Sequence, residues 1–225
     1  MSTTADARRT WVYIDGFNLF YGSLKGTQYR WLDIAAFSRL LLPKNSVERV
    51  KYFTARVAVR GSNPQAAARQ RTYLRALATL PEVETYYGHY LSHVHTLPLA
   101  SATGDVITRN GRTEFARVLR DEEKGSDVNL ASHLLHDAHL DRFDVAVVIT
   151  NDSDLVTPID LVTRDLGLVV GVVNPHAENP RSRQSVQLRQ VASFLKPVRA
   201  AALRKCQLPA TLADRDGPIH KPRTW

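Results

Sequence analysis

Five short runs of apolar residues alternate along this chain with segments that have helical patterning. The runs cover residues 11–15, 47–59, 83–91, 143–150 and 168–173. Each run has the length and the β-branched or aromatic content of a strand. Strands that alternate with helices form parallel sheets with right-handed crossovers. The pattern therefore predicts a doubly wound, three-layer α/β/α fold around a parallel five-stranded core sheet of order 3-2-1-4-5.

The segments between these runs supply the predicted helices, which cover residues 31–42, 64–80, 126–140, 153–166 and 183–195.

Residues 94–122 break the alternation because they have no clean period. Asn110-Gly111 is typical of a tight β-hairpin turn, whereas residues 113–120 are also compatible with the start of a helix. We therefore expect an irregular insertion, and the role of its 94–112 part stays open.

The length of 225 residues suits one α/β domain with an appendage. We expect the domain to cover residues 10–195. Residues 196–225 contain four prolines, which oppose regular structure, and we expect them to form a basic, extended C-terminal arm.

The single cysteine, Cys206, excludes an intramolecular disulfide and favours a reducing compartment. Residues 1–9 have no apolar signal core, and no run approaches membrane-spanning length. The expected location is therefore the cytoplasm, without membrane association.

Positive charge gathers near the end of the sequence. Residues 176–225 contain ten Lys/Arg against three Asp/Glu, so they carry +7 of the net charge of +8, and residues 1–175 carry +1. A basic segment beside a near-neutral domain suits a polyanionic substrate, although a solvated tail that aids solubility is the alternative.

Acidic residues stand where the predicted sheet would bring them together. Asp15 ends the first apolar run, Asp152 and Asp154 follow the fourth, and Asp127 opens the helix over 126–140. In the predicted strand order, the first and fourth strands are neighbours at the edge where ligands bind. Carboxylates held together repel unless a cation offsets them, so we expect Mg²⁺ or Mn²⁺ there.

Roles for these residues follow from that geometry. Asp15, Asp152 and Asp127 are the expected metal ligands, and Asp127 or Asp154 completes the acidic ring or positions an attacking water. Asn18 is placed to face a phosphate or a metal-bound water, while Glu123 and Lys124 are weaker candidates, Lys124 as a phosphate contact. Helix capping by Asp127 or Asp152, and turn formation by Asn18, are the structural alternatives.

Four short motifs, in order, resemble the NYN domain, the LabA-like branch of the PIN-like nucleases. They are Ile14-Asp15-Gly16-Phe17-Asn18-Leu19, Glu123-Lys124-Gly125-Ser126-Asp127-Val128, Thr150-Asn151-Asp152-Ser153-Asp154-Leu155 and Val172-Val173-Asn174-Pro175.

This resemblance implies a Rossmann-like, PIN-like fold and a metal-dependent ribonuclease that hydrolyses RNA through an acidic Mg²⁺ or Mn²⁺ site. The matching catalytic positions are Asp15, Asn18, Asp127, Asp152 and Asp154. Asn151, within the third motif, joins Asn18 and Lys124 as an expected substrate contact. The RNA would be single-stranded or structured.

Other functions stay open from the sequence. The same fold can serve as a non-catalytic module that binds RNA or a protein, or as a phosphatase or phosphotransfer receiver. The trios His133, His136, His139 and His89, His93, His95 are weaker candidates for zinc binding or metal-free cleavage. A homodimer is an assembly that the sequence permits.

Overall fold

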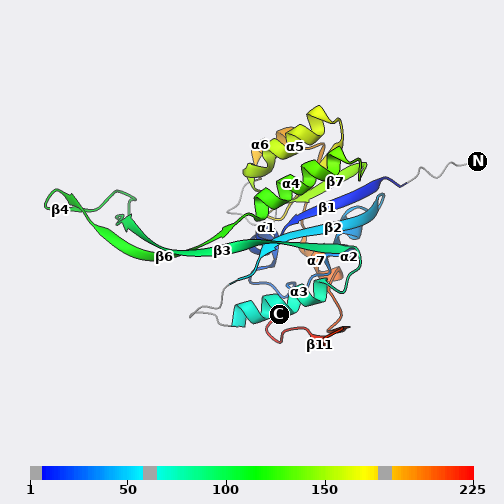
Figure 1. The fold of residues 1–225 in the computed structure, drawn as a ribbon, viewed down its shortest axis with the longest axis horizontal. Helices are drawn as coiled ribbons and strands as arrows, with labels where there is room; N and C mark the ends of the chain where they lie inside the picture. Colours follow the sequence, from blue (N-terminus) through cyan, green and yellow to red (C-terminus); the bar gives the residue numbers. More distant parts are fainter. Residues whose placement is uncertain (1–6, 58–64, 177–183) are drawn as a thin grey trace, which may run out of the picture.

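The chain folds around one seven-stranded sheet that runs through the middle of the molecule (Figure 1). This computed structural model describes residues 7–57, 65–176 and 184–225. The strand order is β6-β3-β2-β1-β7-β8-β9, and neighbouring strands are parallel except for β3 and β6. The bounds are β1 Arg9–Asp15, β2 Ser46–Ala55, β3 Val83–Pro98, β6 Phe115–Lys124, β7 Val145–Ile149, β8 Val169–Asn174 and β9 Phe194–Pro197.

The sheet is thus mixed and larger than the parallel five-stranded core that the sequence predicted. The strands over the five predicted ranges, β3, β2, β1, β7 and β8, lie next to one another, and β6 and β9 extend the sheet at its two edges. The end of the predicted strand over 47–59 lies outside the described residues.

Strand β9 occupies part of the segment predicted as a helix over 183–195, and the helix there is only α6, Val186–Val191. Phe194 in β9 lies over Gly171 in β8, where a Cβ would stand 2.1 Å from the ring.

Helices cover both faces of the sheet and complete three layers (Figure 1). Helices α4, α5 and α6 pack on one face, and α2, α3 and α7 pack on the other. None of the helices that the structure describes is long and apolar enough to cross a membrane. The bounds are α1 Gly16–Leu19, α2 Ile34–Leu41, α3 Gln65–Leu77, α4 Ser126–His139, α5 Val156–Asp160 and α7 Ala200–Lys205, with short helical turns η1 Phe20–Leu24, η2 Ser153–Leu155 and η3 Leu161–Asp165.

Strand β1 lies at the centre of the sheet and is buried on both faces. Val12 and Ile14 join the apolar core beneath α2 and α3, whereas Tyr13 points into the core beneath α4. Each of these side chains is at most 1% exposed. Because both faces of β1 are covered, the position of Asp15 at the end of this strand is fixed.

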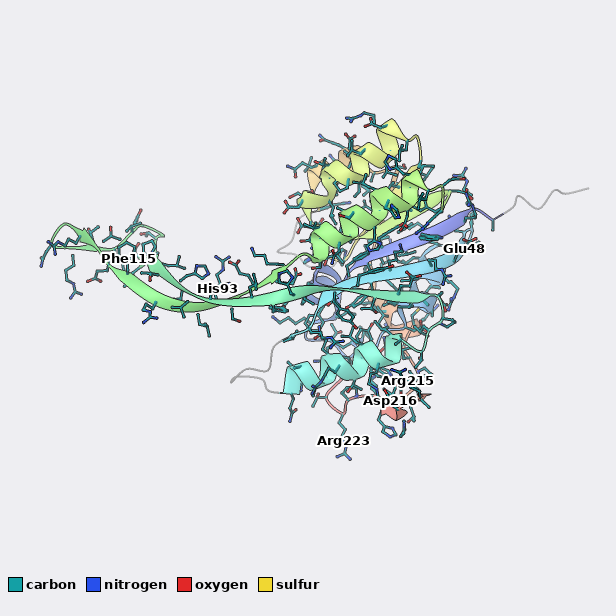
Figure 2. All side chains as sticks on the ribbon, viewed as in Figure 1. Glu48, His93, Phe115, Arg215, Asp216 and Arg223 are labelled. Atoms are coloured by element: carbon teal, nitrogen blue, oxygen red, sulfur yellow. The ribbon has the colours of Figure 1, made fainter. Side chains whose placement is uncertain are left out.

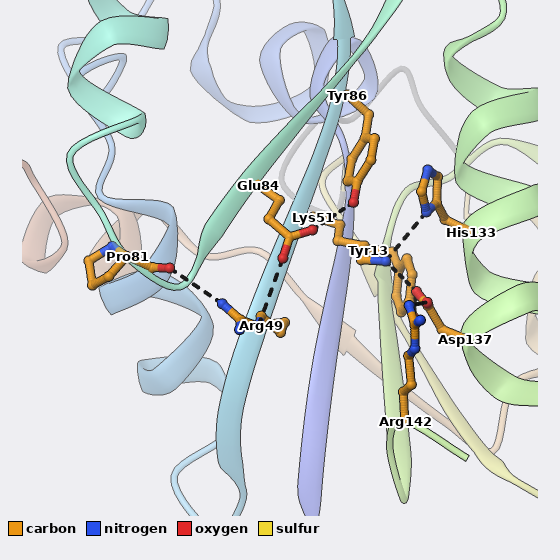
Figure 3. A network of polar contacts seen from close by, with 9 residues as sticks. All are labelled: Tyr13, Arg49, Lys51, Pro81, Glu84, Tyr86, His133, Asp137 and Arg142. Atoms are coloured by element: carbon orange, nitrogen blue, oxygen red, sulfur yellow. Dashed lines mark hydrogen bonds and ion pairs between the residues drawn. The ribbon is translucent and has the colours of Figure 1, made fainter. Parts of the chain in front are cut away.

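A buried polar network ties helix α4 to the sheet (Figure 3). Lys51 Nζ in β2 lies 2.6 Å from Asp137 Oδ2 in α4, and these side chains are 3% and 0% exposed. The Tyr13 hydroxyl donates to the same carboxylate oxygen (2.8 Å), and Arg142 Nη1 donates to the other one (2.9 Å). Asp137 is therefore bonded on both oxygens, which offsets much of the cost of burying its charge.

A two-stranded ribbon projects from the body of the protein (Figures 1 and 2). Strand β3 pairs with β2 as far as Gly88, and residues 89–98 then pair only with β6. Ten residues of extended strand reach roughly 34 Å. Residues 94–122 are therefore mostly regular β-structure, and the alternative helix over 113–120 is wrong because β6 occupies most of that segment.

The turn at Asn110-Gly111 confirms the predicted hairpin. Short strands β4, Thr108–Arg109, and β5, Arg112–Thr113, pair antiparallel on either side of it. Asn110 and Gly111 have φ values of 52° and 73°. Positive φ at both central residues is the geometry of the tight turn that Asn-Gly favours.

The C-terminal segment differs from the predicted extended arm because it folds back onto the domain. Helix α7 is followed by a hairpin of β10, Thr211–Asp214, and β11, Gly217–His220. Leu203, Leu208 and Ile219 are at most 5% exposed and belong to the core beneath α2 and α3. Four prolines therefore do not prevent this segment from packing against the domain.

We expect Asp137→Ala to lower the free energy of unfolding by about 3–5 kcal/mol, because the Lys51 ammonium would remain buried without its main partner. Replacing both residues by apolar ones, Lys51→Met with Asp137→Leu, should cost less than the two single changes added together. Urea denaturation measures both. Asp216→Asn is the matched control, since Asp216 is 68% exposed and lies far from the network. Equal costs for Asp137→Ala and the control would contradict this account.

Candidate metal centre

Strands β1 and β7 are neighbours, so the residues that follow them meet at one edge of the sheet. Asp15 is the last residue of β1, and Asp152 follows the end of β7. A pocket of about 340 Å³, which we call the acidic pocket, opens there. It is lined by four carboxylates, Asp15, Glu123, Asp127 and Asp152, and by Phe17, Asn18, Tyr21, Tyr90, Ser126 and His176.

Asp15 is only 4% exposed, and both oxygens of its carboxylate are hydrogen-bonded. The backbone N–H of Asn18 donates to Oδ1 (2.9 Å), and the hydroxyl of Thr150 donates to Oδ2 (3.2 Å). The Thr150 hydroxyl also accepts a bond from the backbone N–H of Asp152 (3.0 Å). The orientation of the Asp15 carboxylate is therefore set by the segments that follow both strands.

The loop that carries Asp152 is held by the side chain of Asn18. Asn18 Oδ1 accepts a hydrogen bond from the backbone N–H of Asn151 (3.0 Å). Asp152 Oδ1 accepts one from the backbone N–H of Asp154 (3.0 Å), and this bond caps the turn η2. Asp152 thus caps a helical turn and also lines the acidic pocket.

Asp127 reaches the acidic pocket from the first turn of α4. Gly125 precedes the helix with φ of 93°, and Glu123 Oε1 accepts a hydrogen bond from the backbone N–H of Ser126 (3.0 Å). Gly88 in β3 lies against this junction, where a Cβ would stand 2.5 Å from the Lys124 carbonyl oxygen. The absence of a side chain at Gly88 therefore allows the start of α4 to approach the sheet.

The carboxylates of the acidic pocket are poorly compensated. Burial raises the pKa of Asp15 to about 7, and the charges of Asp127 and Asp152 add to this effect. Burial also raises the pKa of Asp127 to about 6, helped by the charges of Asp152, Glu123 and Asp154. None of the described residues that line the pocket is Lys or Arg. A positive charge is thus what the pocket lacks.

The donor set fits a hydrated divalent cation. All four acidic side chains offer the hard oxygen ligands that Mg²⁺ and Mn²⁺ prefer, with the Asn18 amide and the Ser126 hydroxyl beside them. Within the described part of the chain, no three His, Cys, Asp or Glu side chains converge closely enough to hold a metal ion. The chemistry of the lining side chains, rather than their spacing, is therefore what fits such an ion.

Three of the predicted site residues do not line the acidic pocket. Asp154 is exposed, and it is close enough to raise the pKa of Asp127. Lys124 Nζ instead pairs with Glu122 at 2.9 Å. The side-chain oxygen of Asn151 accepts a hydrogen bond from the backbone N–H of Ser185 (2.9 Å), so this residue connects two loops. Asp15, Asn18, Asp127 and Asp152 all line the pocket.

The histidine trios do not gather into a metal-binding group within the described residues. His133 lies against Tyr86, with ring centroids 4.0 Å apart, and 3.4 Å from Lys51 Nζ. His93 and His95 lie on the projecting ribbon (Figure 2 labels His93).

Two residues of the acidic pocket were missed by the sequence reasoning. Tyr90 reaches it from β3, and its ring meets Phe17 edge to face at 5.9 Å. His176 follows β8 and lies over Gly22, where a Cβ would stand 2.8 Å from the imidazole. Burial lowers the pKa of His176 and so favours its neutral form. Gly22 and His176 are far apart in the sequence, so no local pattern predicts their contact.

Two comparisons with known proteins bear on this site. The chain is 31% identical over 238 residues to 6-hydroxy-3-succinoylpyridine 3-monooxygenase HspA from Pseudomonas putida (strain DSM 28022 / S16), which covers 96% of this chain and 75% of that protein. The fold of this chain resembles the crystal structure of a protein of unknown function, VPA0982 from Vibrio parahaemolyticus RIMD 2210633. The TM-score is 0.55 at 16% identity, covering 92% of this chain and all of the other.

A family model adds the decisive comparison. The model of the NYN domain matches residues 9–194, which include the sheet as far as the first residue of β9 and every residue that lines the acidic pocket. The match covers most of the chain, and it agrees with the mixed α/β architecture and with the motifs that carry Asp15, Asp127 and Asp152. This chain therefore belongs to the NYN domain family.

Proposed function

We propose that this protein is a metal-dependent ribonuclease that hydrolyses RNA phosphodiester bonds in the acidic pocket. The observation that carries the proposal is the set of four carboxylates lining one pocket that has no Lys or Arg among its described residues. The raised pKa values of Asp15 and Asp127 show how strongly such a site resists holding uncompensated negative charge. The nuclease-like fold of the NYN family supports the same function.

An RNA phosphate carries negative charge, so the four carboxylates would repel it from an empty pocket. A divalent cation, when bound, would neutralise this charge and polarise a phosphoryl oxygen. Asp15, Asp127 and Asp152 would hold the ion, directly or through water, with Glu123 beside them. Asp15 is the best oriented of the four, because the hydrogen bonds from Asn18 and Thr150 fix its carboxylate.

The other residues have supporting roles. Asn18 keeps Asp15 and the Asp152 loop in register through its backbone N–H and its side-chain oxygen. Asp154 is exposed and close to Asp127, where it can accept a hydrogen bond from the attacking water. Tyr21 is 55% exposed at the rim and offers a flat surface on which an unpaired base can stack. We therefore favour single-stranded RNA as the substrate.

A second candidate function is oxygenation of an aromatic acid, which the likeness to HspA favours. That relative is named as a monooxygenase of 6-hydroxy-3-succinoylpyridine, and the likeness covers nearly the whole chain. A monooxygenase places one atom of O₂ in the substrate and reduces the other to water, so an external reductant is required. A module that binds RNA without cleaving it is the non-catalytic alternative.

We expect Mn²⁺ to raise the melting temperature more at pH 8 than at pH 5. Folding raises the pKa of Asp15 from 3.8 to about 7. The free energy of unfolding therefore decreases as the pH rises from 3.8 to about 7, and the penalty from the ionised Asp15 carboxylate remains above that pH. Asp127 adds the same trend up to about pH 6. A bound cation removes this penalty where the carboxylates are ionised. Thermal melts of the wild type and Asp15→Asn, with and without Mn²⁺, measure the effect.

The Asp15→Asn protein without metal should be more stable than the wild type at pH 8 and lose the Mn²⁺ response. Asp216→Asn, an exposed acid far from the pocket, should behave as the wild type. An equal Mn²⁺ shift in the wild type and Asp15→Asn would exclude the acidic pocket as the metal site.

We expect Asp15→Asn and Asp152→Asn each to lower the rate of RNA cleavage at least about 100-fold, because each removes a charge that positions the cation. Labelled single-stranded RNA incubated with Mg²⁺ or Mn²⁺ measures the rate, and end analysis should show 5′-phosphate products. Circular dichroism checks that the variants fold, and Asp216→Asn should keep full activity. Wild-type activity in excess EDTA, or in either variant, would refute the mechanism.

We expect no consumption of O₂ when the protein is mixed with 6-hydroxy-3-succinoylpyridine and NADH or NADPH. Oxygen uptake measured with an electrode tests this directly. If O₂ uptake depends on the pyridine substrate and no RNA is cleaved, the ribonuclease proposal is wrong and the monooxygenase function is supported. Metal binding with neither activity would favour the non-catalytic module.

A further inference from the structure

A second pocket lies beside the acidic pocket and differs from it in chemistry. Its volume is about 380 Å³, and we call it the aromatic pocket. Phe17 and Tyr21 line both pockets, so helix α1 and the turn η1 form a shared wall. This volume lies within the range of small-molecule sites, which run from about 300 to 1,000 Å³.

Aromatic rings from distant parts of the chain form the inner side of the aromatic pocket. Trp225 packs with its ring centroid 5.7 Å from that of Tyr73, and the Tyr52 ring lies 6.5 Å from Tyr73 at 88°. The Tyr73 hydroxyl donates to the Leu32 carbonyl oxygen (2.8 Å), which fixes its ring. Such a set of edges and faces suits contact with a flat ring.

Gly16 allows the Tyr52 side chain to pack closely against the start of α1. A Cβ at Gly16 would stand 2.6 Å from Tyr52 Cζ and 2.7 Å from the hydroxyl oxygen. Tyr52 therefore lies directly against the residue that follows Asp15. Burial raises the pKa of the Tyr52 phenol, and the nearby charge of Asp15 adds to this effect, so the phenol stays neutral and able to donate a hydrogen bond.

The charge of the aromatic pocket is opposite to that of its neighbour. Lys25, Arg30 and Arg69 line it, and none of the described lining residues is Asp or Glu. Lys25 Nζ lies 4.7 Å from the centroid of the Tyr21 ring, and Arg30 Cζ lies 5.8 Å from that of Trp225. Within the described residues, neither Lys25 nor Arg30 forms an ion pair.

We propose that the aromatic pocket binds a planar aromatic ring that carries a negatively charged group. The ring would contact Tyr52, Tyr73 and Trp225, while the anionic group would face Lys25 and Arg30. A nucleotide of an RNA chain has this chemistry through its base and phosphate. A free aromatic carboxylic acid has it too. The proposal goes beyond the ribonuclease function, because it needs no metal and no cleavage.

Isothermal titration calorimetry of the full-length protein in EDTA tests this binding. The ligands are UMP, AMP and 6-hydroxy-3-succinoylpyridine, with uridine as the uncharged comparison. We expect at least one anionic ligand to bind saturably with a Kd below about 1 mM, and uridine to bind at least about tenfold more weakly. Because EDTA prevents metal-dependent turnover, this result stands or fails separately from the ribonuclease proposal.

Lys25→Gln is the informative variant, since the described contacts of the Lys25 ammonium are limited to the Tyr21 ring. This variant should lower the affinity for the anionic ligands about tenfold and leave the affinity for uridine unchanged. Lys25→Arg should restore the affinity for the anionic ligands. Arg223→Gln is the matched control, because Arg223 is exposed outside the aromatic pocket and points away from the domain (Figure 2). Thermal melts check that each variant is folded.

The outcomes separate the two sources of the ligand. Binding of UMP or AMP that competes with single-stranded RNA assigns the aromatic pocket to a nucleotide of the substrate. Binding of 6-hydroxy-3-succinoylpyridine alone assigns it to a free aromatic acid. Either result supports the proposal. No binding of any anionic ligand, or equal affinity in the wild type and Lys25→Gln, would overturn it.

Discussion

The parallel pairing of β1 with β7 is the constraint on which the candidate site depends. These strands come from distant parts of the chain, yet their pairing places Asp15 and the Asp152 loop at one edge of the sheet. The hydroxyl of Thr150 then bonds to both segments, so the two acids share one hydrogen-bond network. The buried bridge between Lys51 and Asp137 fixes α4 against the same sheet, and the first turn of this helix delivers Asp127.

Much of this arrangement could be predicted from the sequence, because it follows from local signals and a general rule of sheet topology. Apolar runs located the strands β1 and β7, and the position of an acid at the end of each run then implied proximity. The ribbon could not be predicted in the same way. Its strands β3 and β6 are joined by a segment whose sequence has no clean period, and half-exposed strands lack a clear alternation. Tyr90 and His176 were missed because only long-range packing brings them to the acidic pocket.

The C-terminal segment shows why composition is a weak guide to packing. Prolines suggested an extended arm, but Leu203, Leu208 and Ile219 provide enough apolar surface to join the core. Trp225 continues this packing beside Trp31 and Tyr73, with ring centroids 6.1 and 5.7 Å away. The segment therefore completes the aromatic pocket, which the family match over residues 9–194 does not include in full.

The ribbon has a mechanical consequence for the site. Tyr90 and Glu123 pair opposite each other at its base, and both side chains also line the acidic pocket. Farther out, Val94, Phe115 and Leu119 expose between 53% and 62% of their surface to water. A molecule that covered these apolar side chains would contact the same two strands that supply Tyr90 and Glu123 to the acidic pocket. A change in the direction of the ribbon would therefore shift the side chains that form one wall of the acidic pocket.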